Sequence, residues 1–226
     1  MATCDEVLGF LRAAANPASQ AEMARVGIVG AHRLGVPVPE MRRIAKANGR
    51  DHALALALWK TGIADARIVA SMIADPAKLT ERDMDAWARD FDSWDVVDQV
   101  CSNLFDKTPL ARRKILQWSK RDEEYVKRAA FVLIACLAWH DKKAADAEFL
   151  AWLPLIAGAA TDERNFVRKA VNWALRNIGK RNAALNQAAI QTAEEIQSKD
   201  SKAARWIAAD ALRELRSDAV QQRLAK

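Results

Sequence analysis

The sequence has few of the features that mark β-proteins, membrane proteins and secreted proteins. Its 226 residues include only eight Gly and six Pro, and strand-like alternation of apolar and polar residues is absent. No run of 18 apolar residues occurs, which excludes a spanning helix, and the acidic start Met1–Glu6 argues against a secretory signal peptide. The three cysteines Cys4, Cys101 and Cys136 are distant and odd in number, so we expect Cys101 and Cys136 to be buried thiols in a cytoplasmic protein.

The motifs of common enzyme chemistries are also missing. His32, His52 and His140 share no ligand spacing with Cys or carboxylates, so no metal site is predicted. There is no phosphate-binding loop, dinucleotide fingerprint or nucleophile elbow. Any catalysis must therefore rely on carboxylates, aromatic rings and cations, and no cofactor is expected.

Helical periodicity covers almost the whole chain. The predicted helices span 3–15, 19–29, 39–48, 51–60, 65–74, 80–90, 94–105, 108–119, 123–139, 145–159, 163–180, 182–196, 201–213 and 217–224. Thr80, Ser93 and Thr108 fit N-caps. Short connections favour antiparallel neighbours, and helix pairs recurring about every 35 to 45 residues favour an α-solenoid. A compact helical bundle is the alternative. We see no domain boundary within 1–226.

Charge is unevenly distributed along the chain. Residues 1–106 hold 12 Lys and Arg against 15 Asp and Glu, whereas residues 107–226 hold 23 against 14. A basic half beside a weakly acidic one is typical of a protein that binds a polyanion on one surface. Ordinary solubilising charge would give a similar imbalance.

The segment 165–180 predicts a helix with two distinct faces. Its apolar stripe consists of Val167, Ala170, Val171, Ala174 and Ile178. The opposite side carries Lys169, Trp173, Arg176 and Lys180. An indole outside the core and flanked by cations suits a polymer of phosphates and sugars.

Trp94 and Asp98 are four residues apart, so they lie on one face of a predicted helix. Asp95, in the first turn, is explained by the helix dipole. Asp98 lies deeper, where it could offer a negative charge to a cationic substrate. A solvated carboxylate beside a partly buried indole is the alternative.

A third candidate lies at the start of the helix 123–139. Lys127 and Arg128 oppose the helix dipole there, and Arg128 could bind a phosphate or pair with Glu124. The following run, 131–137, predicts a buried central helix. Apart from Trp94 and Trp173, which stand among charges, the indoles follow apolar stripes and are expected in the core or at a groove edge: Trp59, Trp87, Trp118, Trp139, Trp152 and Trp206.

These motifs resemble the AlkD-type DNA alkylation repair family of HEAT-like-repeat DNA glycosylases. The resemblance is carried, in the family's order, by Gly35–Lys46, Ser93–Asp98, Lys127–Ala130, Phe166–Arg176 and Arg205–Leu215. It implies a solenoid of HEAT-like antiparallel helix pairs with a concave basic groove. It also implies hydrolysis of the N-glycosidic bond of cationic alkylated purines, of the 3-methyladenine and 7-methylguanine class, in double-stranded DNA.

The resemblance assigns roles to individual residues. Asp98 corresponds to the catalytic carboxylate, and Trp94 and Trp173 to two indoles that contact the sugar. Arg128 corresponds to a phosphate-binding arginine, although an alignment shifted by one at Tyr125 would select Lys127. The cations Lys169, Arg176 and Lys180 would then hold the flanking phosphates.

Three functions follow as hypotheses. The first is a monofunctional alkylpurine DNA glycosylase, acting as a monomer in the cytoplasm in association with the nucleoid. The second is a non-catalytic HEAT-like repeat protein that binds distorted or branched DNA. The third is a protein-binding solenoid, which is a common use of helical repeats.

Overall fold

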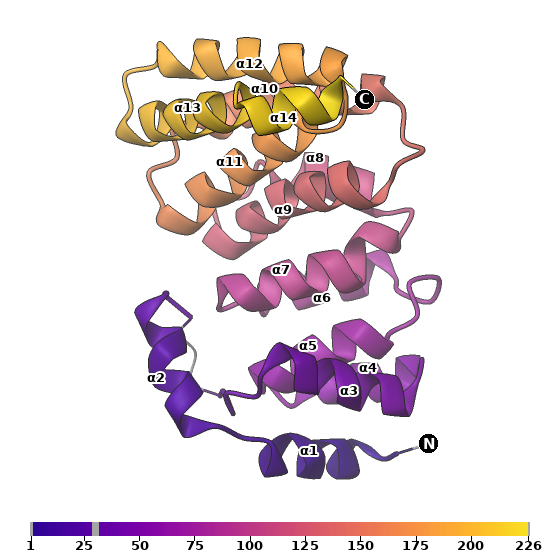
Figure 1. Cartoon of the computed structure of the whole chain (residues 1–226). Helices are drawn as coiled ribbons and strands as arrows, with labels where there is room; N and C mark the ends of the chain where they lie inside the picture. The colour runs from indigo at the N-terminus through magenta and orange to yellow at the C-terminus, as the bar shows by residue number, and fades with distance from the viewer. Residues whose placement is uncertain (1, 29–31, 226) are drawn as a thin grey trace. The chain divides into compact units, whose positions relative to one another are not determined.

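Every regular element in the described residues is a helix (Figure 1). The computed structural model describes residues 2–28 and 32–225. The elements are α1 (Cys4–Ala13), α2 (Pro17–Arg25), α3 (Val38–Asn48), α4 (His52–Lys60), α5 (Ala64–Ile73), α6 (Glu81–Arg89), α7 (Trp94–Asn103), the 3₁₀ turn η1 (Phe105–Lys107), α8 (Ala111–Trp118), α9 (Glu124–His140), α10 (Asp146–Ala159), α11 (Asn165–Gly179), α12 (Ala183–Gln197), α13 (Lys202–Leu215) and α14 (Asp218–Leu224).

Each predicted helical range overlaps one of these α-helices, so the all-α class is confirmed. Residue 29, the predicted end of the second helix, lies outside the described residues. Thr80 caps α6 as predicted, because its side chain accepts a hydrogen bond from the Asp83 amide at 3.1 Å. The Thr108 cap is wrong, because Thr108 ends η1 and α8 begins only at Ala111, three residues later. The Thr108 hydroxyl instead donates to the Phe105 carbonyl at 2.8 Å.

The chain packs as two compact units, Met1–Ala111 and Arg112–Lys226. This division does not test the prediction of one repeat domain over 1–226, because each repeat in such an array packs only on its neighbours. The two units are therefore described separately.

In the first unit, α5 packs against α3, α4 and α7. The Trp59 and Trp87 rings are stacked, with centroids 3.9 Å apart and planes 3° apart. Both indoles are buried, as are Trp118 and Trp152 in the second unit. The expectation that these four tryptophans lie in the core is confirmed.

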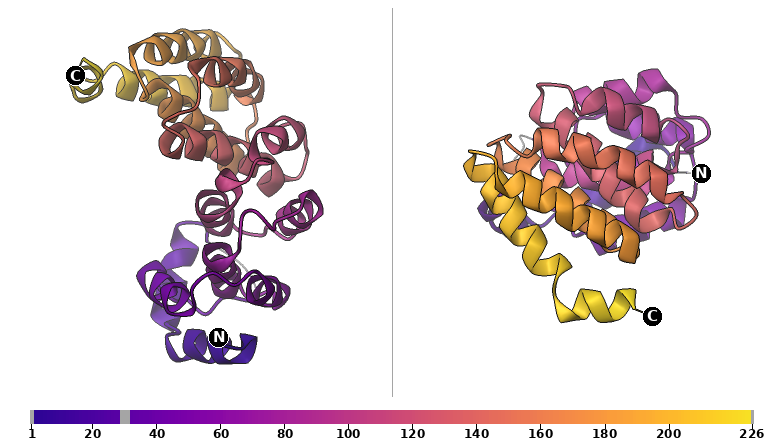
Figure 2. Two further views of the ribbon diagram at one scale, coloured as in Figure 1. Left: turned by 90° about the vertical axis from the view of Figure 1, so that its right-hand side faces the viewer. Right: turned by 90° about the horizontal axis from the view of Figure 1, so that it is seen from above.

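In the second unit, α9 packs most extensively against α11. Residues 131–137 are buried, so the predicted burial of this run is confirmed, and Cys136 is buried with them. Figure 2 shows the helices of this unit lying side by side, with α14 beyond the end of α13.

The helices α9, α11 and α13 run in the same direction. Near the start of α9, Arg128 donates to the Phe166 carbonyl of α11, and further along, Asn177 of α11 donates to the Ala135 carbonyl of α9. Since the later residue of one helix meets the later residue of the other, α9 and α11 are parallel. From α11 to α13, Asn172 and Lys180 bind Asp210 and Glu214 in the same order. The 38-residue separation of Arg128 from Phe166, and of Asn172 from Asp210, agrees with the predicted repeat length.

Candidate functional site

Trp94 and Asp98 lie one turn apart on α7, as their spacing predicts. Both side chains are half-buried. The core side of the same helix is fully buried and consists of Val96, Val97, Val100 and, just after the helix, Leu104. The pair therefore lies beside the core and not within it.

The Trp94 indole is anchored by its nitrogen. Its Nε1 donates a hydrogen bond to the Val26 carbonyl at 3.2 Å. Val26 is the C-cap of α2, where a helix leaves carbonyl oxygens without partners inside the helix. The end of α2 thus fixes one edge of the ring and limits its rotation.

Asp95, beside Trp94, holds a charged partner from far along the chain. Arg33 donates from both terminal nitrogens to the Asp95 carboxylate, at 2.7 and 2.9 Å, and the Ser93 hydroxyl donates at 2.5 Å. The Arg33 and Asp95 side chains are only 6% and 15% exposed. Sequence reasoning attributed Asp95 to the helix dipole and missed Arg33, because a single cation 62 residues away forms no recognisable spacing.

The loop that carries Arg33 is held by a buried carboxylate. Asp65, at 1% exposure, accepts hydrogen bonds from the Leu34 amide at 2.7 Å and the Val36 amide at 2.8 Å. Gly35 between them has φ of 75°, and an added Cβ would lie 2.5 Å from a backbone oxygen. The conformation therefore requires glycine, and it presents Arg33 to α7.

The two predicted phosphate-binding residues of α9 also have contacts within the protein. Arg128 is only 5% exposed and donates to the Phe166 carbonyl at 2.6 Å. Lys127 forms an ion pair with Asp162 at 3.0 Å. Both cations thus fasten the start of α11 and the preceding loop to α9, and their contact with DNA stays a prediction.

Asp162 predicts an acid-sensitive contribution to stability. The Arg164 guanidinium, helped by Lys127, lowers the pKa of the Asp162 carboxyl from 3.8 to about 2. Because this pKa is lower in the folded state, the stabilisation is present above pH 3.8 and is lost as pH falls toward 2. With solvent screening we expect it to be about 1 kcal/mol. Urea denaturation should show a higher free energy of unfolding for the wild type than for Asp162→Asn at pH 5. This difference should nearly vanish as the pH approaches about 2. A difference independent of pH would contradict this origin.

The two faces predicted for α11 are both present. The apolar stripe is fully buried and consists of Val167, Ala170, Val171, Ala174 and Ile178. On the other side Lys169 is exposed, whereas Trp173, Arg176 and Lys180 are half-buried. The stripe of cations and indole is therefore outside the core, as predicted.

Carboxylates of α13 partly neutralise that cationic face. Arg176 pairs with Asp210 at 2.8 Å and with Glu214 at 3.0 Å, and Lys180 pairs with Glu214 at 2.8 Å. Burial alone would raise the pKa of Asp210, but the Asn172 amide and the Arg176 guanidinium outweigh it and hold that pKa below its usual value. Sequence reasoning missed Asp210 and Glu214, although their i,i+4 spacing was a usable signal.

Two further tryptophans stand among charges, contrary to the expectation that only Trp94 and Trp173 do so. Trp139 is 63% exposed, and Trp206 is 38% exposed. The Arg168 guanidinium lies 5.1 Å from the centroid of the Trp206 ring. Trp139 ends the apolar run of α9, and its exposure excludes the core and leaves the groove edge of the two places expected for it.

The described ranges contain no cluster of three His, Cys, Asp or Glu side chains that could hold a metal ion. Within the same ranges, no helix combines the length and apolar character needed to cross a membrane. The predicted site residues are divided between the units, with Trp94 and Asp98 in the first and Arg128 and Trp173 in the second.

Paired helices in a recurring register define the chain as a helical-repeat protein. The cations on one face of α11 suit a polyanionic ligand. The profile of the family described as DNA alkylation repair enzyme matches residues 8–215. The chain belongs to this family.

Comparison of structures identifies the fold more closely. The chain is similar to a solved structure described as a member of a new family of proteins related to the HEAT-like repeat DNA glycosylases, with affinity for branched DNA structures. The two chains are 20% identical and superpose with a TM-score of 0.77, and the match covers 94% of this chain and 95% of the other. The HEAT-like repeat fold predicted for this chain is thus confirmed.

Weaker similarity extends to two artificial proteins. An engineered protein has 14% identity and a TM-score of 0.44, with coverage of 96% and 99%. A designed armadillo repeat protein in complex with the peptide (KR)4 has 13% identity and a TM-score of 0.37, with coverage of 83% and 89%. The curated proteins include no match to the sequence.

Proposed function

We propose that the protein is a DNA glycosylase that hydrolyses the N-glycosidic bond of cationic alkylated purines in duplex DNA. The observation that carries this proposal is the pair Trp94 and Asp98, one turn apart and half-buried beside the core, in a chain of the DNA alkylation repair enzyme family. A carboxylate is a poor choice for a surface that only binds phosphates. Its presence beside an anchored indole favours chemistry on a cation.

The chemistry requires few groups. An alkylated purine already carries a positive charge, so it can leave without a general acid. As the bond breaks, the deoxyribose acquires oxocarbenium character, which Asp98 would stabilise while orienting the attacking water. The face of Trp94 would lie against the sugar, where its electron density favours positive charge. The same role for Trp173 stays a prediction of the family resemblance.

The deciding experiment measures release of 7-methylguanine from methylated duplex DNA by the purified protein. Release that depends on Asp98 supports the glycosylase. A protein that binds this DNA without releasing base would instead be a non-catalytic DNA-binding repeat protein. That second candidate is favoured by one observation, the affinity for branched DNA described for the structural relative at 0.77 TM-score.

The ion pairs of α11 give a separate prediction for DNA binding. If Arg176 meets phosphates, Asp210→Asn should weaken its pairing, which then rests on Glu214 alone, and should raise the affinity for undamaged duplex DNA several-fold. The dependence of log affinity on log salt should steepen by up to about one unit, since a cation less fully paired within the protein would displace counterions. Fluorescence anisotropy across a salt series measures both quantities.

Glu194→Gln is the matched control for this charge change. It removes one negative charge from α12, where Glu194 pairs with Arg216 and not with a cation of α11. We expect a smaller gain in affinity and an unchanged salt slope. Equal effects of the two substitutions would mean that only net charge matters and that Arg176 does not contact DNA.

A further inference from the structure

A pocket of about 630 Å³ lies in the second unit, at the ends of α9 and α11 and the loop after α9. Two indoles line it, the exposed Trp139 and the half-buried Trp173. Its volume falls within the range of roughly 300–1,000 Å³ that is typical of sites for small ligands. The pocket thus contains Trp139, which does not belong to the core, together with Trp173, which is one of the predicted sugar contacts.

Arg181 forms a charged part of the pocket lining. It donates to the carbonyl oxygens of Ala138 at 2.7 Å, Asp141 at 3.0 Å and Ala144 at 3.3 Å. Its guanidinium also lies 4.1 Å from the centroid of the Phe149 ring. These neutral partners fix the side chain without cancelling its charge.

The other charged side chains make the pocket electropositive. Lys142 and Arg223 are exposed, and no carboxylate of the described residues forms an ion pair with Lys142, Arg181 or Arg223. Lys180 also lines the pocket but pairs with Glu214. The one carboxylate in the lining, Asp146, accepts hydrogen bonds from the Asn182 amide at 2.8 and 3.0 Å.

Trp139 supplies an exposed aromatic surface next to these cations. It is 63% exposed and stacks on His140, with centroids 5.0 Å apart and planes 27° apart. An unpaired base can stack on such a ring, whereas a base inside a duplex is already stacked. Cations beside a stacking ring match the phosphate and base of one nucleotide.

We propose that this pocket binds an unpaired nucleotide of a DNA strand, with its base on Trp139 and its phosphate against Lys142 and Arg223. This proposal rests on the DNA binding of the proposed function. It adds a preference for DNA with unpaired nucleotides to the preference for alkylated purines. The protein would bind gapped or branched DNA more tightly than continuous duplex. Neither Trp139 nor Lys142 belongs to the proposed catalytic set, so binding and base release can be tested apart.

The test compares two DNA probes by fluorescence anisotropy, a continuous duplex and the same duplex with a short single-stranded gap. We expect the wild type to prefer the gapped probe. Trp139→Ala should lower that preference about tenfold, the effect of losing one stacked base, and Lys142→Gln about threefold. Trp139→Phe should restore most of the preference, because a smaller ring still stacks.

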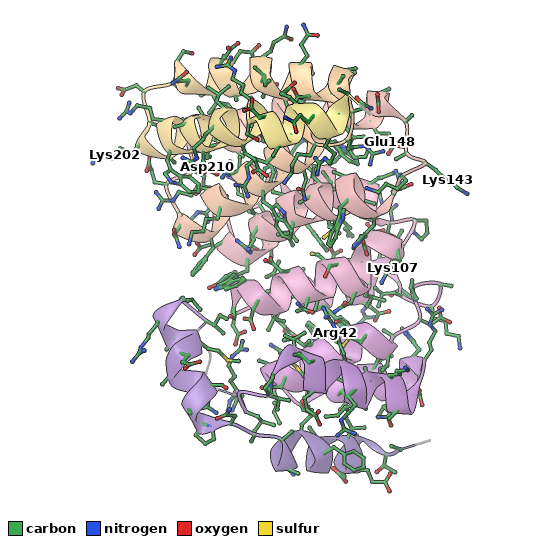
Figure 3. All side chains as sticks on the ribbon, viewed as in Figure 1. Arg42, Lys107, Lys143, Glu148, Lys202 and Asp210 are labelled. Carbon is green, nitrogen blue, oxygen red and sulfur yellow. The ribbon has the colours of Figure 1, made fainter. Side chains whose placement is uncertain are left out.

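Lys143→Gln is the matched control. Lys143 is the next residue along the chain and is exposed but does not line the pocket, and its side chain points away from the ribbon (Figure 3). This substitution should leave the preference unchanged. Circular dichroism of each variant checks that the fold is retained.

Several outcomes would overturn the proposal. These are no preference for gapped DNA in the wild type, equal loss of affinity for both probes in Trp139→Ala, and equal effects of Lys142→Gln and Lys143→Gln. Displacement of the gapped probe by polyglutamate as readily as by a single strand of equal charge would assign the pocket to acidic peptides. Base release from methylated duplex by the Trp139 and Lys142 variants should stay at the wild-type rate, because neither residue belongs to the proposed catalytic set and a continuous duplex offers the pocket no unpaired nucleotide. A wild type without base release but with the gapped-DNA preference would refute the glycosylase alone.

Discussion

Asp98→Asn is expected to lower the release of 7-methylguanine from methylated duplex DNA by about 100- to 1,000-fold, the usual effect of removing one group that stabilises charge in a transition state. Asn keeps the size of the side chain but carries no charge to balance the oxocarbenium-like sugar. Affinity for undamaged DNA should stay the same or increase slightly, since a negative charge is removed from a surface that meets phosphates. Single-turnover base release and equilibrium binding measure the two effects.

Asp92→Asn is the control for this experiment. Asp92 is an exposed carboxylate just before α7, so its loss changes net charge by the same amount without removing the group beside Trp94. We expect base release close to that of the wild type. Asp98→Asn acting at the wild-type rate would remove the carboxylate from the mechanism.

Arg33→Met is expected to lower the free energy of unfolding by about 3 kcal/mol, because it leaves the Asp95 carboxylate without its charged partner at a site shielded from water. The double variant Arg33→Met with Asp95→Asn should lose less than the single one, since no unpaired charge remains. Urea denaturation followed by tryptophan fluorescence measures the difference. The pair also fastens the loop after α2 to the start of α7, next to Trp94.

Arg42→Gln provides the comparison. Arg42 is an exposed arginine on α3, labelled in Figure 3, and an exposed charge of this kind contributes about 0 to 1 kcal/mol. Arg33→Met with an effect as small as that of Arg42→Gln would show that water or another cation replaces Arg33. A double variant as unstable as the sum of the two single ones would exclude coupling between them.

The local sequence was sufficient for the elements that carry the candidate site. The spacing of Trp94 and Asp98 predicted their common face on α7, and the apolar stripe of α11 predicted which side of that helix is buried. These predictions depend on helix geometry within four or five residues, which a single sequence contains. The Thr108 cap failed because the 3₁₀ turn η1 lies at this point of the chain and α8 begins only at Ala111.

The partners of the charged residues could not be predicted in the same way. The neutralisation of Arg176 and Lys180 by Asp210 and Glu214 depends on α11 and α13 lying side by side in one register. The sequence left Trp139 either in the core or at a groove edge, because it ends the apolar run of α9, and only the structure shows that the end of that helix is exposed at the pocket. Neither feature is local.

The sequence by itself thus determined an all-helical repeat protein with a basic second half, and it identified Trp94, Asp98 and Trp173 as the residues to test. The match to the DNA alkylation repair enzyme family agrees with the family that the sequence motifs predicted. Only the tertiary structure decided which charges are already paired, how Arg33 reaches Asp95, and that Trp139 joins Lys142 and Arg181 at one pocket. The physical reason is range: helix formation and amphipathic faces follow from neighbouring residues, whereas ion pairs and pockets arise where segments distant in the chain pack together.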